Sequence, residues 1–163
     1  MGKRRMAREM AVQMLYQRDL GDSEVPALVR SFDVPDFLTE TSGGDDPEAP
    51  PPPPVGPRLP EAREAFEYAR RLVEGTVAHL EEIDGLLRAQ ADNWRLERMP
   101  AVDRNVLRLA VYELMHELDV PKLVVLDEAV ELAKRFGSEQ SGRFVNGLLD
   151  GLLRSHEFPG SME

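Results

Sequence analysis

The sequence predicts an all-α fold, a compact bundle of about six or seven helices in one domain that spans residues 1–163. Apolar residues recur every three or four positions through most of the chain, which is the period of an amphipathic helix. No stretch alternates apolar and polar residues for long enough to make a convincing strand, and there is no internal repeat. With 163 residues, 42% of them hydrophobic, the chain can bury one core but is short for two domains.

The first helix is predicted over residues 3–20. Its apolar stripe ends before Gly21, a residue type that commonly follows a helix, and it consists of Ala7, Met10, Ala11, Met14 and Leu15. Residues 25–38 then favour one short helix, with Leu28 and Phe32 on one side.

The middle of the chain predicts one long helix of about seven turns over residues 61–87. Gly75 and Gly85 each lower helix propensity by about 1 kcal/mol, so the helix can bend there. A short connector that contains Trp94 and Leu96 follows.

Three more helices are predicted in the C-terminal half. The first carries an apolar stripe from Val102 to Leu114 and stops before the DVP of residues 119–121, because Val120, which precedes a proline, disfavours the α region. The second lies within residues 121–137 and has acidic residues ahead of basic ones, which suits the helix dipole. The third lies within residues 141–156 and presents a leucine-rich face.

A segment of different composition, at about residues 39–60, interrupts the helical pattern. Ten of the thirteen prolines lie between Pro26 and Pro60, including the run APPPPPVGP. Such a segment has little apolar surface to offset the entropy lost on ordering. It is therefore predicted to be a flexible or semi-rigid insertion that is rich in proline and acidic residues.

Charge is distributed unevenly along this chain, whose formal net charge is -10. Nine acidic and two basic residues lie between Asp22 and Glu61, whereas residues 1–18 hold five basic residues and one acidic residue. The acidic total argues against a general polyanion binder, whose basic charge usually covers a whole face. The basic start is therefore a local feature that needs its own explanation.

The cations at the start of the first helix predict a phosphate-binding site. Cations at this end oppose the helix dipole, so they do not serve the helix. Guanidinium groups beside the unpaired N–H groups of a helix N-terminus suit phosphate, and single-stranded RNA also offers unstacked bases. Binding to a membrane is disfavoured, because the neighbouring apolar stripe is short and rich in alanine. The candidate residues are Lys3, Arg4, Arg5 and Arg8.

The sequence offers no pattern typical of an active site, a metal site or a cofactor site. It has no cysteine, and its three histidines lie on different predicted helices. Glu113 and His116 make one Glu-x-x-His pair, where helical di-iron proteins need two. No glycine-rich phosphate motif appears. We expect no enzyme, no cofactor and no metal and, without a signal peptide or spanning segment, a soluble cytoplasmic protein.

Five motifs, in this order, resemble the family of bacterial transcription antitermination factors NusB. They are RRMAREMAVQMLYQ near the N-terminus, VLRLAVYEL at 106–114, DVP at 119–121, LDEAVELAKRFG at 126–137 and RFVNGLLD at 143–150. The resemblance covers residues 3–20 and about 63–155. It implies a NusB-like helical fold and a protein that binds the boxA element of nascent RNA together with NusE, a small-subunit ribosomal protein. It also implies that this complex suppresses termination by RNA polymerase, notably in ribosomal RNA operons, with other Nus factors as indirect partners.

The same resemblance implies roles for individual residues. The family's arginine-rich start contributes to RNA binding, and the tyrosine of its LY pair and the loop before the last helix lie near RNA. This adds Tyr16, Gln140 and Arg143 to the four cations. The NusE contact is expected around the connector and the following helix, between Arg98 and Arg104, with Asp103 as a polar partner. Family members occur as monomers or self-associate, which leaves a homodimer open.

Two other functions are weighed against RNA binding. Certain bacterial RNA cytosine methyltransferases begin with a NusB-like domain and continue into an α/β domain that carries a catalytic cysteine. This sequence contains neither, which argues against such an enzyme. A helical adaptor that contacts only proteins, with an inert basic start, is the second alternative.

Overall fold

The structure, a computed structural model, describes residues 2–21, 23–42, 47–48, 50–51, 54–91 and 95–162. These residues form eight α-helices and two short 3-10 helices, with no strand, so the predicted all-α class is confirmed. The elements are α1 (Lys3–Leu20), α2 (Val25–Ser31), α3 (Val34–Ser42), η1 (Gly56–Arg58), α4 (Leu59–Ala78), α5 (Leu80–Gln90), η2 (Leu96–Arg98), α6 (Ala101–His116), α7 (Lys122–Phe136) and α8 (Glu139–Ser155).

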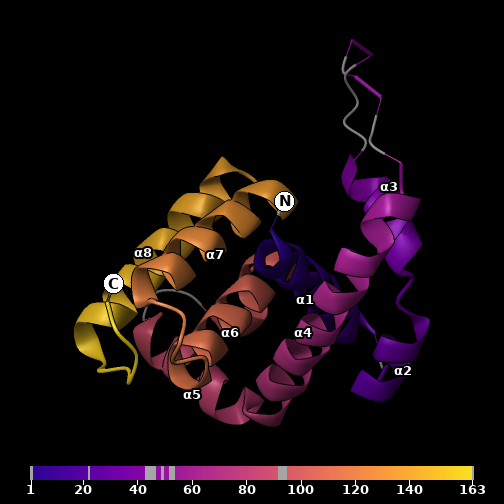
Figure 1. Ribbon diagram of the computed structural model, residues 1–163. Helices are drawn as coiled ribbons and strands as arrows, with labels where there is room; N and C mark the ends of the chain where they lie inside the picture. The colour runs from indigo at the N-terminus through magenta and orange to yellow at the C-terminus, as the bar shows by residue number, and fades with distance from the viewer. Residues whose placement is uncertain are drawn as a thin grey trace.

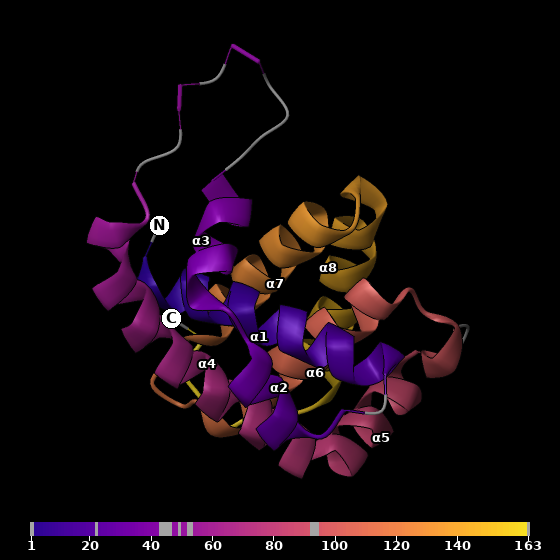
Figure 2. The same ribbon diagram turned by 90° about the vertical axis from the view of Figure 1, so that its right-hand side faces the viewer.

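Helix α1 runs through the middle of the bundle and packs against α4 and α6 (Figure 1). Helices α7 and α8 pack together beside α6, while α2 and α3 lie along α4 (Figure 2). Every residue from Met6 to Val12 is buried, so two turns of α1 are enclosed on all sides and not only along the apolar stripe. Polar side chains in these two turns therefore need partners inside the protein.

The predicted long helix over residues 61–87 is two helices, α4 and α5, which meet at His79. His79 has φ -110° and ψ 19°, so the break lies there and not at Gly75 or Gly85. Gly75 has a packing role instead, because a Cβ atom at this position would overlap the ring of Tyr112 in α6. The glycine permits a close approach between α4 and α6.

Residues 25–42 form two helices where one was predicted. Phe32 ends α2 with extended backbone, and α3 begins two residues later. Phe37 and Leu38 of α3 are almost completely buried, which explains why this second helix forms against α4. These two additional helix breaks account for eight helices in place of six or seven.

The ends of the predicted insertion at 39–60 are helical. Helix α3 continues to Ser42, and η1 and α4 begin at Gly56 and Leu59. Much of the predicted insertion's centre, residues 43–46, 49 and 52–53, lies outside the described residues, as does the connector's Trp94. Its predicted flexibility therefore stays a prediction. Of the helices described, none has the length and apolar character that crossing a bilayer requires.

Candidate nucleic-acid interface

Three cations at the start of α1 form an exposed cluster, which we call the cationic tip. It consists of Lys3, Arg4 and Arg5, whose side chains are 55%, 53% and 52% exposed. No acidic residue lies in the first turn of α1, and Gly2 supplies no side-chain cap. The tip therefore combines positive side chains with the positive end of a helix dipole, as the sequence predicted.

Each cation of the tip is held by a carboxylate from another element. Lys3 donates to Glu64 of α4 at 2.6 Å, and Arg4 donates to Asp119 in the turn after α6 at 2.9 Å. Arg5 makes two hydrogen bonds to Glu128 of α7, at 2.8 and 3.1 Å. These bonds lower the pKa of Asp119 and of Glu128 below that of an ordinary carboxyl group. The tip is thus oriented by three acidic side chains before any ligand arrives.

Arg8, the fourth predicted phosphate contact, is placed differently. Its side chain is only 4% exposed, and it binds Glu113 of α6 through three hydrogen bonds of 2.9–3.0 Å. Phosphate contact requires an exposed guanidinium group, and Arg8 does not have one. Its position could have indicated this, because Arg8 lies four and seven residues before buried Val12 and Leu15 and so shares their helix face.

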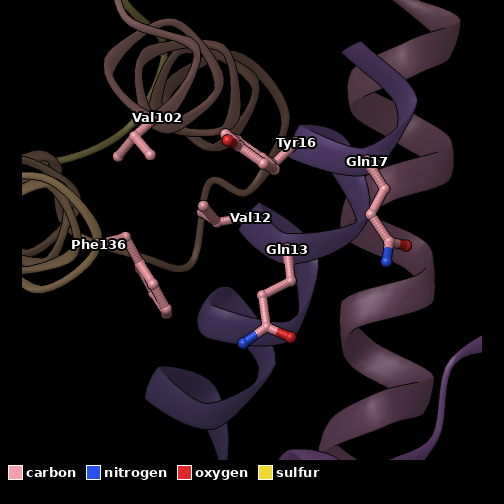
Figure 3. Close-up of a pocket in the computed structure, with 6 residues that line it drawn as sticks. All are labelled: Val12, Gln13, Tyr16, Gln17, Val102 and Phe136. Carbon is pink, nitrogen blue, oxygen red and sulfur yellow. The ribbon is translucent and has the colours of Figure 1, made fainter. Parts of the chain in front are cut away.

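A groove lies further along α1, and Tyr16 lines it as a half-exposed side chain. Its volume is about 360 Å³, and its walls are Val12, Gln13, Tyr16 and Gln17 of α1, Val102 of α6 and Phe136 of α7. Figure 3 shows Tyr16 and Phe136 reaching into the space between these helices. Two aromatic rings with nearby amide groups can stack on a base and hydrogen-bond to its edge. Phe136 was not among the site residues predicted from the sequence, although it directly precedes the predicted helix end at Gly137.

Arg135 connects the tip to the groove, since it lines a shallow pocket together with Arg5 and Glu128 and directly precedes Phe136. Its guanidinium binds Glu9 at 3.0 Å. Glu9 is buried, and burial raises its pKa although the positive charge of Arg135 opposes that shift. Arg135 is 39% exposed, so one part of it can reach a ligand while another holds Glu9. The sequence prediction did not include it.

The other predicted RNA contacts lie on the first turns of α8. Gln140 and Arg143 are both exposed. Gln140 lines a second groove of about 350 Å³, whose other walls are Met99, Pro100, Asp103, Ser138, Ser141 and Phe144. Asp103 directly follows Val102 of the first groove, so the two grooves are neighbours. Arg5 and Tyr16 therefore both lie beside α7, whereas Lys3 and Arg4 lie beside α4 and the turn after α6.

The predicted NusE contacts, Asp103 and Arg104, are largely enclosed. Asp103 is 3% exposed, and burial raises the pKa of its carboxyl group despite a hydrogen bond with Ser141. The Arg104 side chain is 12% exposed and binds Asp19 of α1. It also donates to the carbonyl oxygens of Leu96 and Met99 at 3.1 Å, which fixes the connector to α6. Both residues hold this region together, and neither offers a widely exposed side chain.

Two of the three histidines lie side by side in the bundle. His79 and His116 stack at the junction of α4 and α5, with ring centroids 4.1 Å apart. Within the part of the chain that the structure describes, no group of three or more His, Cys, Asp or Glu side chains could hold a metal ion.

Comparison with known proteins gives consistent results. The model of the NusB family matches residues 55–154. The transcription antitermination protein NusB of Sorangium cellulosum is 46% identical over 155 residues, which cover 95% of this chain and 94% of that protein. The structure of T. maritima NusB matches with a TM-score of 0.64 and 36% identity, over 96% of this chain and 93% of its own. A chain in a crystal structure of antitermination factors NusB and NusE in complex with dsRNA matches with a TM-score of 0.70 and 28% identity, over 94% of this chain and 98% of that one.

Proposed function

This chain belongs to the NusB family, and we propose that it is a transcription antitermination factor that binds boxA RNA of nascent transcripts together with NusE. The relatives' name and the complex of NusB, NusE and RNA support this role. In the same proposal, the complex supports transcription of ribosomal RNA operons and meets RNA polymerase and other Nus factors indirectly. The chain is proposed to work without catalysis, in the cytoplasm.

The observation that carries the proposal is that Arg135 connects Arg5 of the cationic tip to the aromatic groove. A single strand can place its phosphates on Lys3, Arg4 and Arg5 and its bases against Tyr16 and Phe136. The present ion pairs of the tip do not prevent this. Exposed ion pairs are weak because water screens their charges, so a phosphate can replace a carboxylate.

The burial of Arg8 lowers the proposed number of phosphate contacts at the start of α1 from four to three. Each phosphate that is neutralised on a single strand changes the slope of log affinity against log salt by about 0.7, so the tip should contribute about -2. Arg8 is proposed to position the tip, because its bond to Glu113 fixes α1 against α6.

NusE is proposed to bind near the connector and the start of α6. Arg98 is exposed there, whereas Asp103 and Arg104 are enclosed. The two enclosed residues are therefore proposed to shape the NusE surface from within, and exposed neighbours such as Arg98 to touch the partner. A homodimer stays a separate proposal, without residues assigned to it.

The test is an RNA titration over a salt series, with a boxA-like RNA and a scrambled one, each with and without NusE. The variant Lys3→Ala/Arg4→Ala/Arg5→Ala should bind boxA RNA more weakly and lose about 2 from the salt slope. The matched control removes three other exposed, ion-paired arginines, namely Arg70, Arg88 and Arg154.

The control variant should keep the wild-type slope of log affinity against log salt, although it loses as many positive charges as the tip variant. Equal affinity of the tip variant and wild type would overturn the proposed RNA site. If neither wild type nor the tip variant bound RNA while both still bound NusE, the protein would be a helical adaptor that contacts only proteins.

A further inference from the structure

We infer that Arg71 of α4 is a further phosphate-binding residue, so that bound RNA continues from the cationic tip across Tyr68 onto α4. The inference deepens the proposed function and depends on RNA binding at the tip. It adds a contact from a helix that the sequence did not connect with RNA.

Arg71 and the tip share one aromatic ring, that of Tyr68. The guanidinium of Arg4 lies 5.7 Å from the centroid of the Tyr68 ring, and that of Arg71 lies 5.3 Å from it. Cations are attracted to such a ring, so Tyr68 holds two arginines from different helices at one place. Burial and the charge of Glu113 raise the pKa of Tyr68 to about 12, so its side chain stays a neutral phenol beside them.

Arg71 is both oriented and exposed. Its Nε and Nη2 atoms donate to Glu117 at 3.2 and 2.5 Å, and Glu117 is only 2% exposed. Arg71 itself is 62% exposed, which is the highest value among the ion-paired cations discussed above apart from Arg154. A guanidinium has five N–H donors. One edge of Arg71 can therefore stay on Glu117 while its remaining donors face a phosphate.

The cationic surface ends near Arg71. The hydrogen bond from Arg4 lowers the pKa of Asp119, and the nearby charge of Arg71 lowers it further. The two arginines thus act on one location. Beyond Arg71 the character of the surface changes, because His79 lies 4.0 Å from Glu82 and the first turn of α5 is acidic. We therefore place the end of the RNA contact at Arg71.

The experiment must separate loss of the contact from damage to the fold, since removing Arg71 alone would leave buried Glu117 without its counter-charge. The reference is therefore the variant Glu117→Gln, and the test is Arg71→Ala in that background. Both are titrated with the boxA-like RNA at saturating NusE over a salt series, and circular dichroism and melting temperature report on folding.

The slope of log affinity against log salt should be shallower by about 0.7 for the test variant than for its reference. This difference corresponds to about fivefold weaker binding near 0.1 M salt. The matched control is Arg70→Ala in the same background. Arg70 is the adjacent residue, is 48% exposed and pairs with Glu74 on α4 itself. It should leave slope and affinity unchanged.

Equal slopes for the test variant and its reference would overturn the inference. If the tip variant still lost about 2 from the slope, the proposed function would survive that result. If the tip variant also bound like wild type, the proposed function would fail with it. Weaker NusE binding by the Arg71 variant in the absence of RNA would assign this surface to the protein partner and would likewise overturn the inference.

Discussion

Replacing Arg8 by Met should destabilise the protein without removing a phosphate contact. The variant keeps a side chain of comparable length but leaves the carboxylate of Glu113, which is 2% exposed, without its counter-charge. Breaking a buried pair on one side costs about 3–5 kcal/mol. For a chain of this size, each kcal/mol lowers the melting temperature by about 2–4 °C, so a loss of roughly 10 °C is expected.

The loss should depend on pH in a defined direction. Burial raises the pKa of Glu113, although the hydrogen bond and the charge of Arg8 act to lower it. Without Arg8 the carboxyl group takes up a proton more readily in the folded state than in the unfolded state. Protonated Glu113 stabilises the folded variant at low pH. This contribution is lost as the pH rises through the folded-state pKa of Glu113. The stability difference between wild type and Arg8→Met should therefore shrink as the pH is lowered through the raised folded-state pKa of Glu113.

Two further measurements complete the test. The double variant Arg8→Met/Glu113→Leu should recover much of the stability, because an apolar pair of similar volume often replaces a buried ion pair without loss. RNA titration at a temperature where Arg8→Met is folded should give the wild-type salt slope. An unchanged melting temperature together with a slope reduced by about 0.7 would refute the structural role assigned to Arg8.

Other predictions concern the bundle itself. Gly75→Ala should destabilise the protein by about 1–2 kcal/mol in thermal or chemical unfolding, because overlap with Tyr112 outweighs the gain in helix propensity. Asp19→Asn should cost about 2–4 kcal/mol, since Arg104 loses its carboxylate partner. Although burial opposes the shift, the hydrogen bonds from Arg104 and Asn105 lower the pKa of Asp19 below its ordinary value. The stability difference should therefore be complete above about pH 4 and disappear as the pH falls through the lowered folded-state pKa. Replacing residues 43–54 by a short Gly-Ser linker should change the melting temperature by less than about 2 °C, because that composition offers little apolar surface.

The helical class and the exposed part of the site follow from the sequence for simple reasons. Amphipathic periodicity reports which face of each helix is buried, and it needs no knowledge of the partner helix. Cations that oppose a helix dipole are a local feature too, so Arg4 and Arg5 could be identified directly. The break at His79 was less accessible, because His79 leaves the helical conformation without a proline or glycine at that position. The break within 25–42 did have a signal, because Pro35 lies in the first turn of α3.

The partners of the cations could not be predicted, because they are distant in sequence. Lys3 and Glu64 are 61 residues apart, and Arg5 and Glu128 are 123 apart. No local pattern relates such positions, since only the packing of α1 against α4 and α7 brings them together. For the same reason an arginine that anchors the core, such as Arg8, resembles its exposed neighbours in the sequence.

If the proposed site binds RNA, these contacts explain how an acidic protein can make that site specific. A basic cluster without partners would attract any polyanion, whereas carboxylates beside Arg4 and Arg5 compete with a ligand for the same donors. A phosphate alone gains little from that exchange, because one ion pair replaces another. Binding should become favourable when bases also occupy the groove beside Tyr16 and Phe136, where apolar contact adds free energy that the carboxylates cannot supply. Selectivity for a single strand with accessible bases then follows from the pairing of the cations, and it does not require a positively charged protein.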